Sequence, residues 1–357
     1  MHMAVEIGLF ALGALIVFIT IHSAIRTFVL PRGERVFLTK LTFVAVLQVF
    51  RLSMLTARTY HLRDRRMALY APVALLVTPV VWTVLVIFGY ACMYWAMDVR
   101  PFDAAVELSG SSLLTLGTVP FLRFEITLLQ FSEAVIGLGL IALLLAYLPT
   151  MYNAFSAREA VVSMLEVRAG SPPSATNFIL RLHRNFGLHD LTDTWIIYER
   201  WFVQIEESHT SLAALVYFRS PVADRSWITA AGAVLDTAAI ILSSLDVPYE
   251  TQAALTIRSG FLALRRIADL FGIPYNPNSR PGDPISISRE EFDEVIDQLA
   301  EAGVPLKADR DDCWRNFAGW RVNYDAVLLQ IALLVYAPYA PWSSDRSLPR
   351  SHRMRLR

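Results

Sequence analysis

The chain has 357 residues, of which 55% are hydrophobic, and its mean hydropathy of +0.43 is too high for an ordinary soluble enzyme. Its 32 basic and 32 acidic residues balance, so the charge gives no reason to expect nucleic acid as a partner. The apolar excess lies in the first 153 residues. We therefore expect a membrane unit followed by an α-helical cytoplasmic domain at residues 154–357.

The N-terminal segment 1–24 is predicted to be a retained transmembrane span. Residues 4–21 are apolar apart from Glu6, and they lack the positively charged start and the small-residue cleavage site of a secretory signal. The next segment, 25–66, carries nine basic residues against Glu34 and Asp64 alone. Such a surplus marks the cytoplasmic side of a membrane, which places the N-terminus outside.

The apolar stretch 36–57 inside this basic segment has two interpretations. Lys40, Gln48 and Arg51 interrupt it, and a crossing here would put the basic residues 26–35 outside. We therefore favour an amphipathic helix at the inner interface, with a further span as the alternative. The favoured interpretation gives three spans.

Two long apolar segments, 67–97 and 124–151, enclose a stretch of different character. Tyr90, Tyr94 and Trp95 lie near the outer end of the first and are interpreted as interfacial aromatics. Residues 102–120 between the segments are too polar and too short to span. Pro101 suits a helix start, and about three helical turns would follow. Span, re-entrant helix, turn and span form the plan of a pore loop.

The second apolar segment carries features that suit an inner helix. Gly137 and Gly139 are small residues in mid-span, where they permit close contact or bending, and Pro149 is expected to kink the inner end. Ile141 and Leu145 share a helix face at i, i+4. If that face is axial, symmetric copies would form apolar rings that gate the pore by dewetting.

Glu133 is a carboxylate within this apolar segment, and a charge there is a functional hypothesis by default. One interpretation is that it supports the short helix from behind through Ser109 or Ser111. The other is a carboxylate that reaches out to the outer interface.

The residues Ser112-Leu113-Leu114-Thr115-Leu116-Gly117-Thr118 resemble the pore signature T-x-x-T-V-G-Y-G-D of potassium channels. Residues 133–144 are similar to the inner helix of bacterial two-transmembrane potassium channels, and the resemblance covers residues 67–155. It implies an all-α membrane protein with a potassium-channel-like pore module at 67–153 that follows an extra N-terminal span and precedes a helical cytoplasmic domain. It also implies a homotetramer and a selectivity filter formed by Thr115, Leu116, Gly117 and Thr118, with Ser112 and Glu133 in support.

The chain departs from the family's pattern in the filter itself. Thr118, Val119 and Pro120 stand where the family has Tyr, Gly and Asp. A β-branched residue resists the positive φ that the second Gly adopts, and Pro120 pushes Val119 further toward an extended conformation. We therefore expect weak discrimination between K⁺ and Na⁺, the two candidate permeant ions.

The cytoplasmic domain carries little chemistry. We expect the inner helix to continue to Gly170, and the apolar stretches 227–245 and 326–340 to be buried bundle helices rather than further spans. Glu206 and His209 have a metal-binding i, i+3 spacing but lack a second pair, so neither a metal nor another cofactor is expected. Asp236 in its apolar helix requires a partner, for which Arg258, Arg265 and Arg266 are the candidates.

These patterns predict a multi-pass plasma-membrane cation channel, not an enzyme, that is regulated by its cytoplasmic domain. The alternative is a non-conducting receptor or scaffold that retains the pore fold. A membrane-tethered enzyme is disfavoured because no catalytic set stands out. The sequence does not specify the cytoplasmic ligand.

Overall fold

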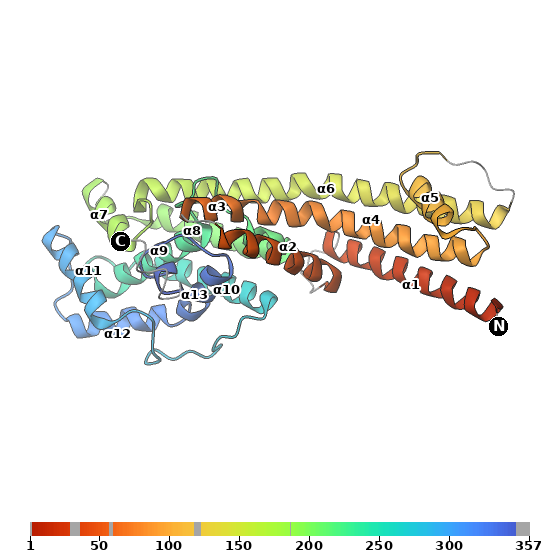
Figure 1. Cartoon of the computed structure of the whole chain (residues 1–357). Coiled ribbons are helices and arrows are strands. Elements are labelled where there is room, and N and C mark those ends of the chain that lie inside the picture. The colour runs from red at the N-terminus through yellow and green to blue at the C-terminus, as the bar shows by residue number, and fades with distance from the viewer. Residues whose placement is uncertain (1, 29–35, 57–59, 118–122, 186, 348–357) are drawn as a thin grey trace. The chain divides into compact units, whose positions relative to one another are not determined.

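The computed structural model describes residues 2–28, 36–56, 60–117, 123–185 and 187–347 (Figure 1). Within these ranges every regular element is a helix, and the only extended pairing is an isolated bridge between Leu245 and Leu306. By length and composition, five of the helices in the described residues could cross a membrane. The predicted all-α class is thus confirmed for the described residues, and the long apolar helices are compatible with a membrane protein.

The chain divides into two compact units. The first unit comprises residues Met1–Ala57 and Leu69–Asn153, and the second comprises Arg58–Ala68 and Ala154–Arg357. The basic segment predicted at 25–66 is therefore shared between the units. Its last part belongs to the second unit, where Asp64 forms an ion pair with Arg219.

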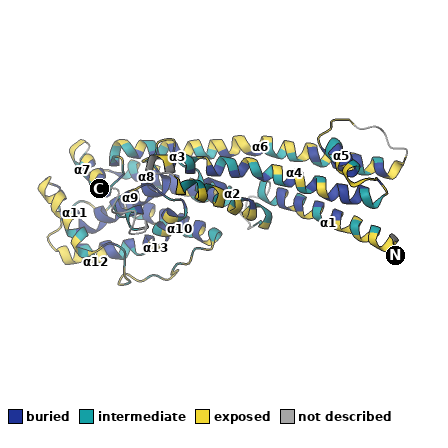
Figure 2. Cartoon of the chain, in the orientation of Figure 1, coloured by how far each residue is buried: buried dark blue, intermediate teal, exposed yellow. Residues whose placement is uncertain are grey.

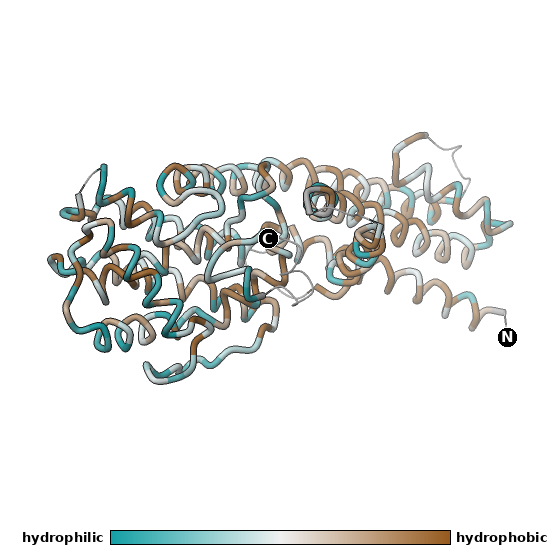
Figure 3. Tube along the Cα trace, turned by 60° about the vertical axis from the view of Figure 1, so that its left-hand side comes forward, coloured by the Kyte–Doolittle hydropathy of each residue, from teal (hydrophilic) through white to brown (hydrophobic). Residues whose placement is uncertain are grey.

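The first unit contains most of the apolar sequence, which appears brown in the helices that follow the N-terminus in Figure 3. Its elements are α1 (His2–Phe28), α2 (Phe37–Leu55), α4 (Tyr70–Ala96), α5 (Phe102–Leu113) and the first part of α6 (Phe124–Ala169).

The helices α1 and α4 pack most closely where Gly13 faces Gly89. A Cβ on either glycine would overlap the backbone oxygen of the other. Small residues of this kind let two apolar helices approach closely without a hydrophobic driving force between them.

Helix α2 packs against the N-terminal end of α4. The Tyr70 hydroxyl donates to the carbonyl of Phe43 over 3.3 Å, and its ring contacts the rings of Phe43 and Phe50. By length and composition α2 is also a candidate span. Both interpretations of residues 36–57 therefore stay open.

The second unit is a bundle of shorter helices that joins the last part of α6 to ten further elements. They are α3 (Tyr60–Ala68), α7 (Ala175–Asn185), α8 (Thr192–Ser211), the 3₁₀ helix η1 (Ala213–Tyr217), α9 (Trp227–Ser244), α10 (Thr251–Phe271), α11 (Arg289–Glu301), α12 (Arg310–Arg321), α13 (Asp325–Leu334) and α14 (Ser344–Ser347).

Helix α9 forms the centre of this bundle, and Figure 2 shows it dark blue along its length. All of its residues are buried, and α7, α10, α12 and α13 pack around it. Its composition makes it a candidate span, but its complete burial within the unit confirms the predicted core helix. A capping box formed by Ser288 and Glu291 is present at the start of α11.

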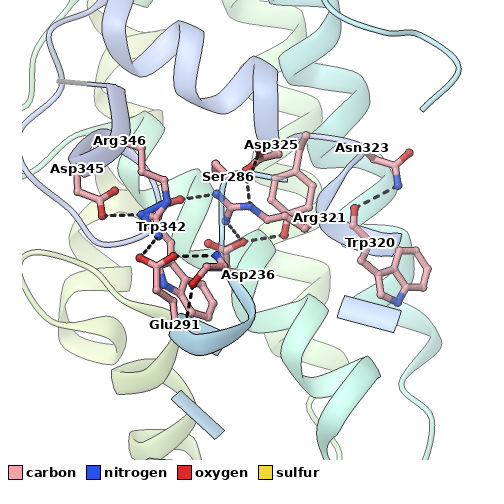
Figure 4. Close-up of polar contacts among 12 residues, drawn as sticks. Asp236, Ser286, Glu291, Trp320, Arg321, Asn323, Asp325, Trp342, Asp345 and Arg346 are labelled. Carbon is pink, nitrogen blue, oxygen red and sulfur yellow. Dashed lines mark hydrogen bonds and ion pairs between the residues drawn. The ribbon is translucent and has the colours of Figure 1, made fainter. Parts of the chain in front are cut away.

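Asp236 is the charged residue at the middle of α9, and its partner differs from the prediction. Arg321 of α12 forms an ion pair with Asp236 and donates to Asp325 over 2.8 Å (Figure 4). The Tyr324 hydroxyl donates to Asp236 over 2.8 Å. Burial disfavours the charge on Arg321, but the two carboxylates outweigh it and raise the pKa of the guanidinium.

The predicted partners Arg258, Arg265 and Arg266 are wrong because α10 directs them elsewhere. Arg265 donates to the carbonyls of Asn323 and Pro277, Arg266 pairs with Glu206, and Arg258 is exposed. The spacing within one helix does not reveal which neighbouring helix supplies a counter-charge.

Candidate functional site

The short helix α5 lies between the two long apolar helices α4 and α6, as the sequence predicts. It begins at Phe102 after Pro101, has Asp103 in its first turn, and ends at Leu113. An acidic residue in the first turn suits the positive end of the helix dipole. At 1.5 Å per residue its 12 residues span about 18 Å, which is too short to cross a hydrocarbon core of about 30 Å.

Glu133 of α6 links α5 and α4. Its side chain is completely buried, the Ser109 hydroxyl of α5 donates to one carboxylate oxygen, and the Tyr94 hydroxyl of α4 donates to the other over 2.9 Å. The contact with Ser109 is the one expected of a supporting carboxylate. The alternative, in which Glu133 reaches the outer interface, is inconsistent with this burial.

Tyr94 is a site residue that the sequence reasoning missed. The interpretation of Tyr90 and Tyr94 as interfacial aromatics is wrong, because both are buried within the first unit. The Tyr90 hydroxyl is 2.8 Å from the Ser132 hydroxyl, so the two tyrosines meet two adjacent residues of α6. Their i, i+4 spacing was the available signal, since it places both hydroxyls on one face of α4.

Gly137 is the point at which the end of α5 rests on α6. A Cβ on Gly137 would overlap the carbonyl oxygen of Leu113, whereas a Cβ on Gly139 would meet no atom within 4 Å. Gly137 therefore permits a close helix contact, which was one of its two predicted roles. The helix is continuous through both glycines and through Pro149.

The loop after α5 folds back onto the end of that helix. The amide of Leu116 donates to the carbonyl of Ser111 over 2.9 Å, and the Ser111 hydroxyl donates to the carbonyl of Gly117 over 3.1 Å. Thr115 and Gly117 both have positive φ, 53° and 91°. The predicted filter residue Thr118 lies outside the described residues.

Ser111 makes the side-chain contact with the loop, whereas the sequence had suggested Ser112. The Ser112 hydroxyl instead donates to the carbonyl of Leu108 in its own helix over 2.8 Å, and its side chain is buried. Adjacent positions on a helix point about 100° apart, so a one-residue error in register exchanges a loop contact for an intrahelical one.

The remaining predicted pore residues are exposed on the single chain. The exposed fractions are 74% for Leu116 in the loop, and 52% for Ile141 and 66% for Leu145 on α6. Such large apolar side chains require lipid or another polypeptide around them.

The predicted metal spacing in the second unit does not assemble a site. Glu206 pairs with Arg266, and the ring of His209 contacts the guanidinium of Arg158. Among the described residues, no group of three His, Cys, Asp or Glu side chains is arranged to hold a metal ion.

Comparisons with known proteins add no relative. No family model matches the chain, and neither a curated protein nor a solved structure shows significant similarity to it.

Proposed function

We propose that the protein is a membrane-embedded cation channel in which four copies surround a central pathway formed by the loop after α5. The observation that supports it most strongly is the local arrangement of the first unit. A short helix is fixed between two long apolar helices by Glu133 and Gly137, and an exposed loop follows it.

The end of α5 has the electrostatics that a cation pathway requires. Its C-terminus at Leu113 precedes the loop, and a helix C-terminus carries a partial negative charge of about half an elementary unit. Non-helical backbone at membrane depth is tolerated only where protein or water surrounds it. One loop cannot encircle an ion, so symmetric copies of the chain are proposed to close the ring.

The selectivity of this pathway is proposed to be weak. The Gly117 carbonyl already accepts a hydrogen bond from Ser111, so only its second lone pair is free for an ion. Val119 and Pro120 disfavour the conformation that would present further carbonyls. Ile141 and Leu145, which are exposed on the single chain, are the proposed gate.

A non-conducting receptor or scaffold is the second candidate, and the Ser111–Gly117 contact favours it. In this contact the Gly117 carbonyl is hydrogen-bonded within its own chain. Such a loop can retain the fold of a pore module but does not offer a complete set of ion ligands. In both candidates the helical second unit is proposed to lie in the cytoplasm as a regulator or assembly domain.

Ion flux from the purified protein in liposomes tests the proposal. We expect K⁺ and Na⁺ flux from the native chain, a tetramer by native mass spectrometry, and no flux from an assembled Gly137→Leu variant. A folded tetramer without flux would support the scaffold, and a monomer or dimer as the only species would refute the channel.

A further inference from the structure

A buried arginine, Arg158, joins the part of α6 within the second unit to the segment 215–218, while Arg181 and Arg225 contact the same helix at residues 163–167. Arg158 is 3% exposed, and its guanidinium donates to the carbonyl of Leu215 over 2.9 Å and to that of Phe218 over 2.8 Å. It also forms an ion pair of 2.8 Å with Glu159. This arginine therefore fixes α6 to both ends of the segment 215–218, which contains the end of η1.

The fourth contact of Arg158 determines the tautomer of His209 on α8. The two side chains meet at 3.2 Å between Arg158 Nη1 and His209 Nε2. A guanidinium can only donate hydrogen bonds, so Nε2 must be the unprotonated acceptor and Nδ1 must carry the hydrogen. The Nδ1 atom is 3.0 Å from the Ser208 hydroxyl, which itself donates to Gln204 over 2.6 Å and is free to accept.

The surroundings of His209 provide little stabilisation for a second positive charge. His209 is completely buried, and α9 contributes the ring of Trp227 at 4.8 Å between centroids. From α6 the charged groups are Arg158 and its partner Glu159; η1 contributes the Leu215 carbonyl, which Arg158 already occupies. Among the described residues, Arg158 and Glu159 are the charged groups around the ring, and the backbone carbonyl of Ile205 is the acceptor that favours its charged form.

A proton on Nε2 would convert an attractive contact into a repulsive one. Two N–H donors and two positive charges would then face each other at 3.2 Å in a buried site. The imidazolium and the guanidinium cannot both keep their positions, so one of the elements that carry them must move.

We propose that His209 and Arg158 form an acid-sensitive latch, in which protonation of His209 releases the second-unit part of α6 from the segment 215–218. Burial and the nearby Arg158 lower the pKa of His209 well below its usual value, so the latch is closed at neutral pH and opens only in acid. Because α6 also provides the proposed gate, release would couple proton concentration to conduction. That last consequence rests on the proposed channel function, whereas the latch does not.

Hydrogen–deuterium exchange on the full-length protein in nanodiscs tests the latch without any flux measurement. Peptides that cover residues 154–169 and 213–219 are compared at pH 7.5 and at successively lower pH, down to the onset of global unfolding, after correction for the intrinsic exchange rate. We expect exchange at least tenfold faster in acid for both peptides of the native protein. Peptides from α9 serve as the internal reference and should keep their protection.

Two variants identify the titrating group. His209→Gln keeps an acceptor for Arg158 but cannot be protonated, so its acid acceleration should fall below about twofold. The exposed His189 provides the matched control, and His189→Gln should behave as the native protein does. If His209→Gln fails to fold, Ser208→Ala remains as a test. It removes the hydroxyl next to Nδ1, which can accept the imidazolium's hydrogen, so it should shift the exchange transition to lower pH.

Three results would overturn the latch. They are an unchanged exchange rate in the native protein, an equal acceleration in His209→Gln, and a loss of protection in α9 to the same extent. Flux measured in parallel separates the two proposals, because a working latch in a protein without flux refutes only the channel.

Discussion

Gly137 of α6 lies directly against the carbonyl oxygen of Leu113, the last residue of α5, with no room for a side chain between them. Gly139, one half-turn further on, faces open space. The two glycines therefore form a matched pair in one helix. We expect Gly137→Ala to displace the end of α5 and to abolish flux or assembly.

The control, Gly139→Ala, should leave the protein intact or stabilise it by up to about 1 kcal/mol through its higher helix propensity. Thermal unfolding in detergent and flux in liposomes measure both effects. An intact Gly137→Ala variant with native flux would show that α5 can shift without consequence.

Glu133 should be required for the position of α5 relative to α4 and α6. Glu133→Leu removes the acceptor for Ser109 and Tyr94. Ser109 can still donate to the carbonyl of Ile87 over 3.1 Å, so the main cost, about 1–3 kcal/mol, comes from the buried Tyr94 hydroxyl. Glu133→Gln keeps one acceptor oxygen and should lose less stability. Tyr94→Phe removes one donor alone, so its loss of stability should be closer to that of Glu133→Gln. Equal unfolding temperatures for the leucine variant and the native protein would exclude this supporting role.

The sequence predicts the elements of the first unit better than their contacts. The hydropathy of α4 and α6 and the polar interval between them locate α5, because length and polarity are properties of each segment alone. The choice between Ser111 and Ser112 as the loop's support depends on helix register. That register is set by the contact of Leu113 with Gly137, which no single segment encodes.

The same distinction explains the second unit. The capping box at Ser288 is local and was predictable, whereas the pairing of Asp236 with Arg321 joins residues 85 positions apart. The role of Arg158 was not predictable from the sequence, because apart from its neighbour Glu159 its partners are two backbone carbonyls and a histidine from distant segments.

The ion pair in the core of the second unit should be costly to break. Arg321→Met leaves Asp236 buried without its cation, for which we expect a loss of about 3–5 kcal/mol. The pair between Arg315 and Asp312 provides the control, since its side chains are 68% and 52% exposed. Arg315→Met should cost less than about 1 kcal/mol. Urea unfolding followed by tryptophan fluorescence measures both, and a core variant within 1 kcal/mol of the native protein would contradict the expectation.

The stability of the second unit should fall in acid through His209. Its folded pKa is lowered by burial first and by Arg158 second, so below the usual histidine pKa of about 6.5 the unfolded chain binds more protons than the folded chain. The contribution of His209 to the free energy of unfolding is therefore complete above about pH 6.5 and decreases as the pH falls toward the folded pKa. Comparison of His209→Gln with the native protein isolates it from the carboxylates. The slopes of the unfolding free energy against pH should differ between the two proteins by up to about 1.4 kcal/mol per pH unit. Parallel curves of free energy against pH would contradict the assignment to His209.

The last prediction concerns the residues that follow the loop. Thr115 and Gly117 both have positive φ. Beyond Gly117, Val119 and Pro120 do not readily adopt the conformation that glycine allows, so an ion would be rehydrated at Thr118. We expect a preference for K⁺ over Na⁺ below tenfold, which corresponds to less than about 1.4 kcal/mol.

Restoring the residues of the potassium-channel pattern should raise that preference. The triple change Thr118→Tyr, Val119→Gly and Pro120→Asp supplies a residue able to take positive φ and removes the proline constraint. The single change Thr118→Tyr is the control, because it adds the ring without freeing the backbone. Reversal potentials under opposed K⁺ and Na⁺ gradients measure all three proteins. Strong K⁺ selectivity in the native chain would mean that its backbone presents the missing carbonyls despite Val119 and Pro120, and a preference for chloride would refute a cation pathway altogether.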